Sequence, residues 1–308
     1  MKIRIGTRAS QLALWQAHFV ADELKKSNPD LDIELVKIIS KGDKILDAPL
    51  AKIGDKGLFT KELDMALLNN DIDIAVHSMK DVPTAIPEGL QITAVPLRGV
   101  VEDAFVSNSW NSIDEVPRGG TIASGSLRRR SQLKAMRPDL KIVDIRGNVN
   151  TRLNKLDESD WDGMILARAG LERLEMHERI RQIIPTSTII PAVGQGALAV
   201  VTNAANESLN NILSTTLHHE ETYRCVFAER QFLRTLEGGC QIPIGCHAII
   251  SDGKFTITGF VGDLEGNVWY RETIQALPDN YDTVGKQLAD VLIEKGASKI
   301  LDEIRNEK

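Results

Sequence analysis

Arginines and small residues occur together where predicted strands end, and such places are suited to binding anions. In residues 124–129, Ser-Gly-Ser-Leu-Arg-Arg, an apolar strand ends and a helix begins. Backbone N–H groups and the positive end of the helix dipole can then meet an anion. Ser126 adds a hydroxyl donor, and Arg128 and Arg129 add forked donors that match carboxylates. A solvated basic helix face is the plainer alternative, but the strand-to-helix junction favours an anion site.

The same arrangement recurs twice along the chain. Arg146 and Arg152 flank the start of a further helix, with Gly147 permitting a tight turn between strand and helix. Arg8 and Ser10 follow the first strand. Three strand ends that carry arginine predict a ligand with several negative charges.

Charge and aromatic content indicate which anions suit this ligand site. Between Ser126 and Arg152 there are eight basic and two acidic residues, an excess of six positive charges in a chain whose net charge is −6. No aromatic residue lies between Asn111 and Asp160, so the basic segment has no platform for stacking bases. Carboxylates or phosphates therefore suit it better than nucleic acid, which also favours basic domains.

Ionisable residues gather after a predicted buried strand over residues 72–77. Asp81 could accept a proton or stabilise a developing cation, and Lys80 could bind an anion. Considered alone, Asp81 is more often a loop-capping residue. His77, on the buried strand itself, is expected to be a hydrogen-bonded structural histidine.

The three cysteines are too few for a disulfide framework. Two glycines precede Cys240 and give its loop the freedom to present a sulfur atom, so that a functional thiol and an inert one both remain open. Cys225 and Cys246 are expected to be buried and inert. Cys246 and His247 lie near Cys240, but the spacing lacks a Cys-x-x-Cys pair, and we expect no metal site.

A glycine- and lysine-containing segment, residues 50–59, is predicted to be a loop, either a positively charged lid or a plain surface loop. At 308 residues the chain is long enough for two or three domains. No run of eighteen apolar residues occurs, and the first residues predict a strand, not a secretory signal. A cytoplasmic location is the default expectation.

Strands and helices alternate through the first two thirds of the chain, which predicts mostly parallel sheets covered on both faces. A helix after Ser10, its expected N-cap, should bury Leu12, Trp15, Phe19 and Val20. A helix is predicted over residues 61–68. Strands are predicted over residues 3–6, 33–39, 72–77, 90–95, 104–107, 121–124, 141–145 and 163–167.

These patterns predict two α/β lobes and a smaller third domain. The first lobe should comprise residues 1–96 and 197–216, because an apolar segment at 191–201 is expected to return to it, and the second lobe residues 97–196. Two crossings would form a hinge, with ligands at strand ends that face the cleft. Residues 217–308 should form a small α+β domain with a long helix to Leu236, a hairpin over 255–273 and terminal helices over 281–304.

The segments resemble the hydroxymethylbilane synthase (porphobilinogen deaminase) family along nearly the whole chain. The matching stretches are GTRASQLALWQA, KGDKILDAPLAKIGDKGLFTKEL, DIAVHSMKDVPT, SGSLRRR, DIRGNVNTRL, PAVGQGA and LEGGCQIPIG. This resemblance implies three domains, two of them hinged, doubly wound lobes similar to periplasmic binding proteins. It implies an enzyme that condenses four porphobilinogen molecules into a linear tetrapyrrole, a monomer, with no nucleic-acid or membrane partner.

The resemblance also implies roles for individual residues. Cys240 matches the cysteine that holds a dipyrromethane cofactor through a thioether bond, and Asp81 matches the catalytic aspartate. Groups that hold side-chain carboxylates of the cofactor or of the growing polypyrrole chain are matched by Lys80, Ser126, Arg128, Arg129, Arg146 and Arg152. Substrate-side positions are matched by Arg8, Ser10 and Arg173.

Some positions depart from the family pattern. Gly125 stands where a hydroxyl residue is common, Asn150 replaces a glycine or glutamine, and Asp55 adds a negative charge to the predicted lid. Residues 100–102 replace a segment that usually contains proline and arginine. These departures concern rate and chain handling rather than reaction type. A binding protein for small polyanions is the main rival hypothesis, but it leaves Cys240 and the third domain without a role.

Overall fold

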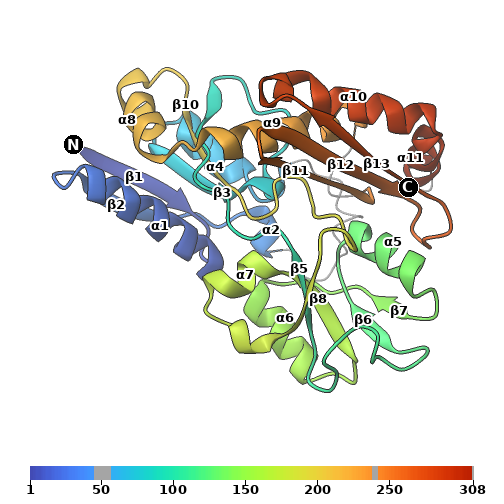
Figure 1. Cartoon of the computed structure of the whole chain (residues 1–308). Helices are drawn as coiled ribbons and strands as arrows, with labels where there is room; N and C mark the ends of the chain where they lie inside the picture. Colours follow the sequence, from blue (N-terminus) through green and yellow to red (C-terminus); the bar gives the residue numbers. More distant parts are fainter. Residues whose placement is uncertain (45–56, 238–241, 307–308) are drawn as a thin grey trace. The chain divides into compact units, whose positions relative to one another are not determined.

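The structure, a computed structural model, describes residues 1–44, 57–237 and 242–306. The described chain divides into two compact units, whose elements are labelled in Figure 1. Unit 1 contains residues 1–44, 57–99 and 196–223, and unit 2 contains residues 100–195, 224–237 and 242–306. Among the described residues, no helix is both long and apolar enough to cross a membrane.

Unit 1 is built on a five-stranded sheet in the order β2-β1-β3-β10-β4. Strand β10 is antiparallel to both of its neighbours, so the other four strands run in one direction, as the sequence predicts. The return of a late segment to this sheet is also confirmed, because β10 follows β4 by about a hundred residues. The strands are β1 (Lys2–Thr7), β2 (Asp32–Lys37), β3 (Ile74–Ser78), β4 (Leu90–Ala94) and β10 (Leu198–Asn203).

Helices α1 (Gln11–Ser27) and α8 (Glu207–Leu217) pack together against this sheet, and α4 (Lys61–Leu68) also contacts it. Ser10 is the N-cap of α1, as predicted, and its Oγ accepts from the Ala13 N–H at 3.3 Å. The predicted buried face of α1 is only partly right. The helix buries Ala13, Gln16, Ala17, Val20, Ala21 and Leu24.

The reason for this difference is side-chain size. Small alanines let the α1 backbone approach the sheet closely, and the larger rings lie beside that contact. Trp15 and Phe19 are partly buried and stack on each other, with ring centroids 5.5 Å apart.

Unit 2 begins with a second five-stranded sheet in the order β7-β6-β8-β5-β9. Strand β5 is antiparallel to both neighbours, and the other four strands share one direction. The strands are β5 (Asp103–Val106), β6 (Thr121–Ala123), β7 (Lys141–Val143), β8 (Gly163–Ala167) and β9 (Ile180–Ile184). Two apolar clusters form its cores, one including side chains of α5 (Leu127–Met136), the other of α6 (Val149–Asp157) and α7 (Arg168–Arg173).

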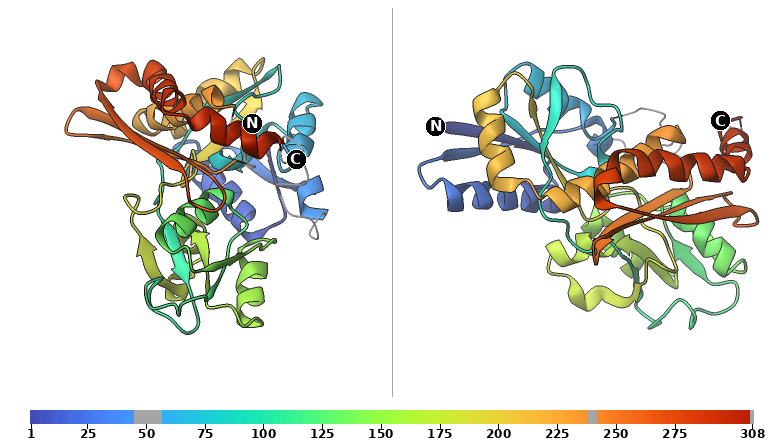
Figure 2. Two further views of the ribbon diagram at one scale, coloured as in Figure 1. Left: turned by 90° about the vertical axis from the view of Figure 1, so that its right-hand side faces the viewer. Right: turned by 45° about the horizontal axis from the view of Figure 1, so that its top comes forward.

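The C-terminal part of unit 2 is a small separate domain with an antiparallel sheet, β11-β12-β13. Its strands are β11 (Ile244–Ser251), β12 (Lys254–Gly262) and β13 (Trp269–Ala276). Helices α9 (Glu220–Thr235) and α11 (Ala297–Asn306) contribute to its core, and α10 (Tyr281–Glu294) lies along the sheet (Figure 2). The predicted hairpin and helices are confirmed. Strands β9 and β11 are absent from the sequence predictions.

Within unit 2, the turn between β12 and β13 packs on helix α5. A Cβ atom at Gly266 would lie 2.3 Å from the Ala135 nitrogen, so only glycine fits there. Beside it, the Arg130 Nε donates to the Leu264 carbonyl at 3.2 Å, and its guanidinium pairs with Glu265. Helix α5, which carries Arg128 and Arg129 in its first turn, is therefore in contact with the C-terminal domain.

Short remaining elements complete the described chain. Helix α2 (Lys41–Lys44) and the 3₁₀ turn η1 (Met79–Asp81) belong to unit 1. The 3₁₀ turns η2 (His177–Arg179) and η3 (Pro278–Asn280) belong to unit 2.

Candidate functional site

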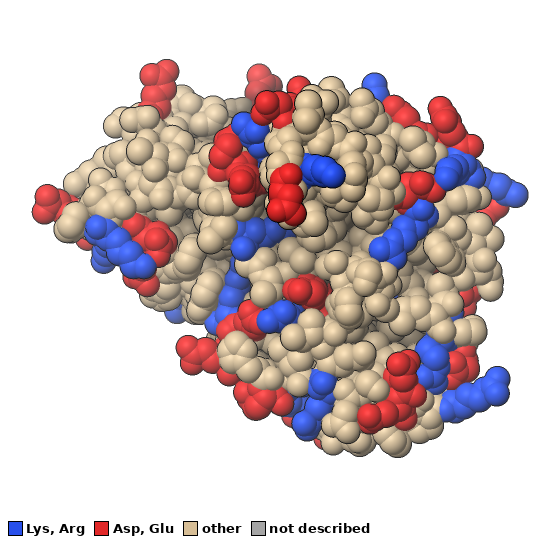
Figure 3. All heavy atoms as spheres, viewed as in Figure 1, with Lys and Arg blue, Asp and Glu red and all other residues tan. Residues whose placement is uncertain are grey.

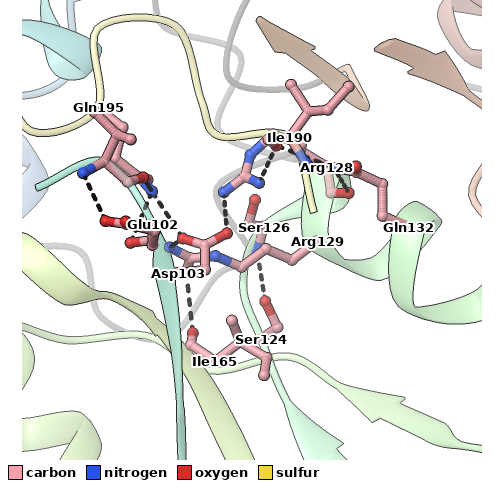
Figure 4. Close-up of polar contacts among 11 residues, drawn as sticks. Glu102, Asp103, Ser124, Ser126, Arg128, Arg129, Gln132, Ile165, Ile190 and Gln195 are labelled. Atoms are coloured by element: carbon pink, nitrogen blue, oxygen red, sulfur yellow. Dashed lines mark hydrogen bonds and ion pairs between the residues drawn. The ribbon is translucent and has the colours of Figure 1, made fainter. Parts of the chain in front are cut away.

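A buried carboxylate lies at the centre of a network of polar contacts in unit 2 (Figure 4). Asp103, the first residue of β5, is fully buried. Its Oδ2 accepts from Arg128 Nη2 at 2.8 Å and its Oδ1 from Arg129 Nη2 at 2.7 Å. We call these three residues the buried triad. Each oxygen of Asp103 thus holds one arginine.

The second terminal nitrogen of each arginine is held by a backbone carbonyl. Arg128 Nη1 donates to the Ile190 carbonyl at 2.6 Å, and Arg129 Nη1 donates to the Ile165 carbonyl at 3.0 Å. Gln195 adds a further donor, because its Nε2 lies 2.8 Å from Asp103 Oδ1. The network therefore joins β5, α5 and β8 to the segment that leads into β10.

Burial and charge act against each other on these groups. Burial by itself would raise the pKa of Asp103, but the charges and hydrogen bonds of Arg128 and Arg129 hold it well below its ordinary value. Burial lowers the pKa of Arg128, against the attraction of Asp103. Asp103 is the only carboxylate of the described chain that pairs with either arginine. The triad thus carries one excess positive charge away from water.

Two donor nitrogens of the triad have no hydrogen-bond partner among the described residues. The Nε atoms of Arg128 and Arg129 are buried, and no described group accepts from them. An unpaired buried donor costs about 1–3 kcal/mol, so an arrangement that leaves two of them calls for a function. An anionic ligand would balance the excess charge.

Burial excludes one of the two interpretations of the basic segment for three of its arginines. Arg128, Arg129 and Arg146 are 4%, 6% and 7% exposed, so these arginines do not form a solvated helix face. Figure 3 shows basic and acidic residues interspersed on the face in view, without a broad basic patch. The solvated-face alternative is therefore wrong for these three arginines, and the anion site stays a prediction.

The turn between β6 and α5 has small residues because space is short. Ser126 is the N-cap residue of α5, but its hydroxyl makes no cap hydrogen bond, and its N–H lies 3.4 Å from Ser124 Oγ. A Cβ atom at Gly125 would lie 2.6 Å from the Ile145 carbonyl oxygen. A hydroxyl residue at 125, common in the family pattern, would require the backbone of this chain to shift.

The three other predicted site arginines of unit 2 lie in or near further elements. Arg152, in α6, donates from Nε to the Gly147 carbonyl at 2.8 Å, and Gly147 has a φ of 117°, as a tight turn requires. Arg146 follows β7. Arg173 is the last residue of α7, and burial lowers its pKa to about 10.

In unit 1, Arg8 is also held by an aspartate. Its Nε donates to both carboxylate oxygens of Asp43 at 3.1 Å, and its guanidinium lies 4.3 Å from the centre of the Phe59 ring. Ser40 Oγ donates to Asp43 at 2.7 Å. Burial would raise the pKa of Asp43, but its bonds to Arg8 and Ser40 lower it.

Lys80 and Asp81 lie on η1, directly after β3. The turn is fixed by the Met79 N–H, which donates to the Ala197 carbonyl at 3.0 Å, and by the Val82 N–H, which donates to the Met79 carbonyl at 3.1 Å. Asp81 is partly exposed, and its carboxylate has no hydrogen-bond or ion-pair partner in the described part of unit 1. The backbone therefore places a carboxylate at the end of a buried strand.

His77 is buried, as expected, but the predicted hydrogen bond is missing at one nitrogen. Its Nε2 has no partner among the described residues. Burial, with a smaller contribution from the nearby charge of Arg8, lowers the pKa of His77 to about 4. The neutral ring can remain in the core without a partner, whereas a charged ring would be strongly disfavoured.

Cys240 and most of the predicted lid, residues 50–56, lie outside the described residues. Cys225 and Cys246 are buried, as the sequence predicts, and neither forms a disulfide with a described residue. In the described ranges, no cluster of three or more histidine, cysteine, aspartate or glutamate residues could hold a metal ion.

Two family models match the chain in sequence order. The model described as "Porphobilinogen deaminase, dipyromethane cofactor binding domain" matches residues 3–211, and "Porphobilinogen deaminase, C-terminal domain" matches residues 223–294. The chain belongs to the porphobilinogen deaminase family. The family named by the sequence motifs is thereby confirmed.

A curated relative extends the match to nearly the whole chain. The porphobilinogen deaminase of Chloroherpeton thalassium is 48% identical over 307 residues, which cover 98% of each chain. Porphobilinogen deaminase is a transferase, and so is this member of the family. The model matched by the first two thirds of the chain is that of a dipyrromethane cofactor-binding domain.

Solved structures of binding proteins resemble the chain more distantly. The methionine-binding protein MetQ has a TM-score of 0.45 and 15% identity, with 74% of this chain and 93% of that chain covered. A nutrient-binding protein from Burkholderia cenocepacia has a TM-score of 0.43 and 12% identity, with 75% and 94% covered. Membership of the porphobilinogen deaminase family depends on the family models and the curated relative.

Sequence reasoning missed the acidic partners of the arginines. Asp103 and Asp43 had no assigned function, and neither had Gln195. A signal for Asp103 was present, because an aspartate that opens the apolar strand Asp-Ala-Phe-Val must be either exposed or paired. No comparable signal marks Asp43, whose partner Arg8 is 35 residues away.

Proposed function

We propose that this member of the porphobilinogen deaminase family is a hydroxymethylbilane synthase. It condenses four porphobilinogen molecules in turn onto a dipyrromethane primer bound to Cys240 through a thioether. Each condensation forms one carbon–carbon bond and releases one ammonia, and a final hydrolysis frees the linear tetrapyrrole. We expect it to act as a monomer in the cytoplasm, as the family resemblance implies.

The observation that carries this proposal is the match to a porphobilinogen deaminase over 98% of both chains. The buried triad supports it from the structure. Its one excess positive charge, which Asp103 leaves unbalanced, suits the carboxylates of pyrrole side chains. The residues present therefore fit the cofactor.

The site residues are proposed in three groups. When bound, the primer supplies the pyrrole carbon to which the first unit is joined. Residues proposed to hold its carboxylates, or those of the growing chain, are Lys80, Ser126, Arg128, Arg129, Arg146 and Arg152, with Cys240 as the anchor. Residues proposed to bind the incoming porphobilinogen are Arg8, Ser10 and Arg173.

Asp81 is proposed as the catalytic residue. Loss of ammonia from porphobilinogen leaves an electrophilic, positively charged methylene-pyrrolenine, which a nearby carboxylate stabilises. One proton leaves the attacked pyrrole carbon for each carbon–carbon bond formed, and the same carboxylate can accept it. Arg8 and Arg173 bind carboxylates of the incoming unit, so that binding energy holds the reacting carbon in place.

The deciding experiment is the intact mass of the denatured protein, followed by peptide mapping. An excess of two linked pyrrole units on the peptide that contains Cys240 is the expected result. Cys240→Ala should lack both the adduct and turnover. Cys225→Ala, which removes a buried thiol from the same domain, is the matched control and should retain both.

If the wild-type protein lacks the adduct, incubation with porphobilinogen separates the two explanations. Appearance of adduct and product would show that the protein had been purified without its primer. Continued absence of both would overturn the proposed function and favour a binding protein for small polyanions.

Asp81→Asn tests the catalytic carboxylate separately from the anchor. The variant should keep the adduct and lose at least about 100-fold in the rate of porphobilinogen consumption, because the carboxylate charge and its proton acceptor are both removed. Wild-type rates in Asp81→Asn would remove this residue from the mechanism.

A further inference from the structure

Asp103 of the buried triad is not one of the proposed site residues, but it contacts two of them. Asp103 touches no solvent, and its two oxygens are divided between two arginines. We propose that Asp103 is the positioning residue that fixes the guanidinium groups of Arg128 and Arg129 for a carboxylate-bearing ligand. This inference rests on the proposed function, because that ligand is the cofactor or the growing chain.

The hydrogen-bond pattern is what makes Asp103 a positioning residue. An arginine has five N–H donors in a rigid plane, so its orientation is fixed once both terminal nitrogens are bound. In Arg128 and Arg129, one terminal nitrogen is bound to Asp103 and the other to a backbone carbonyl. Nε is the nitrogen that remains in each of them, and it has no hydrogen-bond partner among the described residues.

Charge explains why the positioning group is a single carboxylate. Two buried guanidinium groups without a counter-ion would repel each other and would be costly to bury. Two carboxylates would cancel both charges and leave nothing for an anionic ligand. One carboxylate shared by two arginines holds both in place and retains one positive charge.

Asp103 is in turn held by groups on another segment. Gln195 Nε2 donates to Asp103 Oδ1 at 2.8 Å and to the Val101 carbonyl at 2.7 Å. Gln132, one turn after Arg128 on α5, binds both polar atoms of the Ile190 backbone, at 2.8 Å and 3.2 Å. The orientation of the arginine pair therefore depends on β5, on α5 and on the segment before β10 at the same time.

The test compares Asp103→Asn with Asp139→Asn. The first substitution would keep the shape of the side chain but remove its charge, and the new amide could accept from only one arginine. Asp139 forms the same type of pair with Arg137 in the same basic segment, at 2.8 Å on each of two bonds, but contacts neither arginine of the triad. It is therefore a matched control.

The first measurement follows the Nε–H groups directly, by nuclear magnetic resonance on protein with ¹⁵N-labelled arginine. The signals of Arg128 and Arg129 are assigned by their loss in Arg128→Lys and Arg129→Lys. In wild type and in Asp139→Asn they should be sharp and slow to exchange with water, whereas in Asp103→Asn they should broaden or exchange faster. Unchanged signals in Asp103→Asn would overturn the positioning role.

The second measurement is functional. In Asp103→Asn, kcat/KM for porphobilinogen should fall about 10- to 100-fold, and the fraction of protein that carries the adduct should fall, while Asp139→Asn keeps both. A double-mutant cycle with Arg129→Lys should show less than additive losses, because both changes remove one interaction. Additive losses would mean that Asp103 acts independently of the arginine.

Two further arms keep these outcomes distinct. If Asp103→Asn does not fold, Gln195→Met is measured instead, because that change removes a donor to Asp103 and leaves the charges in place. Arginine signals and a kcat/KM equal to those of the wild type in Gln195→Met would then overturn the inference. A wild-type protein without adduct or turnover would instead contradict the proposed function, whereas the resonances would still report on the positioning of the two arginines.

Discussion

Unit 1 and unit 2 both hold an arginine of the proposed site against an aspartate, but in different surroundings. Arg8 and Asp43 are 22% and 27% exposed, and the guanidinium also lies over the Phe59 ring. In the buried triad, the side chains of Arg128, Arg129 and Asp103 are 4%, 7% and 0% exposed. The same pair of residue types thus forms an adjustable surface contact in one unit and a fixed internal network in the other.

The difference shows how burial changes the contribution of an arginine–aspartate pair to stability. Around Arg8, water can replace Asp43 at little cost, so the pair contributes little stability and can exchange its carboxylate for another. Around Asp103, water is absent and each charge depends on its partner. We therefore expect Arg8 to bind each incoming substrate molecule in turn and the buried triad to bind a ligand that is not released between turnovers.

Removing the aspartate from each unit should give the largest contrast. Asp103→Ala should lower the free energy of unfolding by about 3–5 kcal/mol, because two buried guanidinium charges lose their counter-ion. Asp43→Ala should cost no more than about 1 kcal/mol, because water screens the pair. Hydrogen exchange of each unit in increasing denaturant measures both losses in the free energy of unfolding. Equal losses for Asp103→Ala and Asp43→Ala would contradict the comparison.

Acid should affect unit 1 before unit 2. Folding lowers the pKa of His77 from 6.5 to about 4, so the unfolded chain takes up the proton more readily. The free energy of unfolding of unit 1 should therefore fall by about 3 kcal/mol as pH drops from 6.5 to 4. The contribution of Asp103, whose pKa folding depresses, is fully present above its ordinary value of 3.8 and is lost only at lower pH.

Hydrogen exchange of β3 and β5 between about pH 6.5 and pH 4.5 checks this order, after correction for the intrinsic pH dependence of exchange. His77→Gln, which cannot titrate, should flatten the pH dependence of β3 and leave that of β5 unchanged. Parallel losses in both strands would contradict the assignment to His77.

The two serines of the proposed site should give the smallest difference. Ser10 caps α1 through Ala13, so Ser10→Ala should cost about 1 kcal/mol of stability, and Ser10→Asn, which retains a cap, should restore most of it. Ser126 makes no cap hydrogen bond. Ser126→Ala should therefore change stability by less than about 0.5 kcal/mol, as measured by urea denaturation. A cost as large as that of Ser10→Ala would show that the hydroxyl of Ser126 has a structural partner.

The sequence by itself determined the elements and the family. Apolar periodicity located most strands and the helix α4, because burial of one face imposes a regular pattern on the residues. The family motifs named arginines, serines and a catalytic aspartate by type and order. The periodicity of α1 was less informative, since three of the six residues that it buries are alanines, whose small side chains give a weak signal.

Only the tertiary structure decided how those residues are used. Asp103 meets Arg128 and Arg129 across 25 and 26 residues, and Arg8 meets Asp43 across 35. Such pairings depend on which strands become neighbours in a sheet, and local sequence does not fix that choice. The same holds for burial, which decided between a solvated basic face and an internal network with two donors that no described group satisfies.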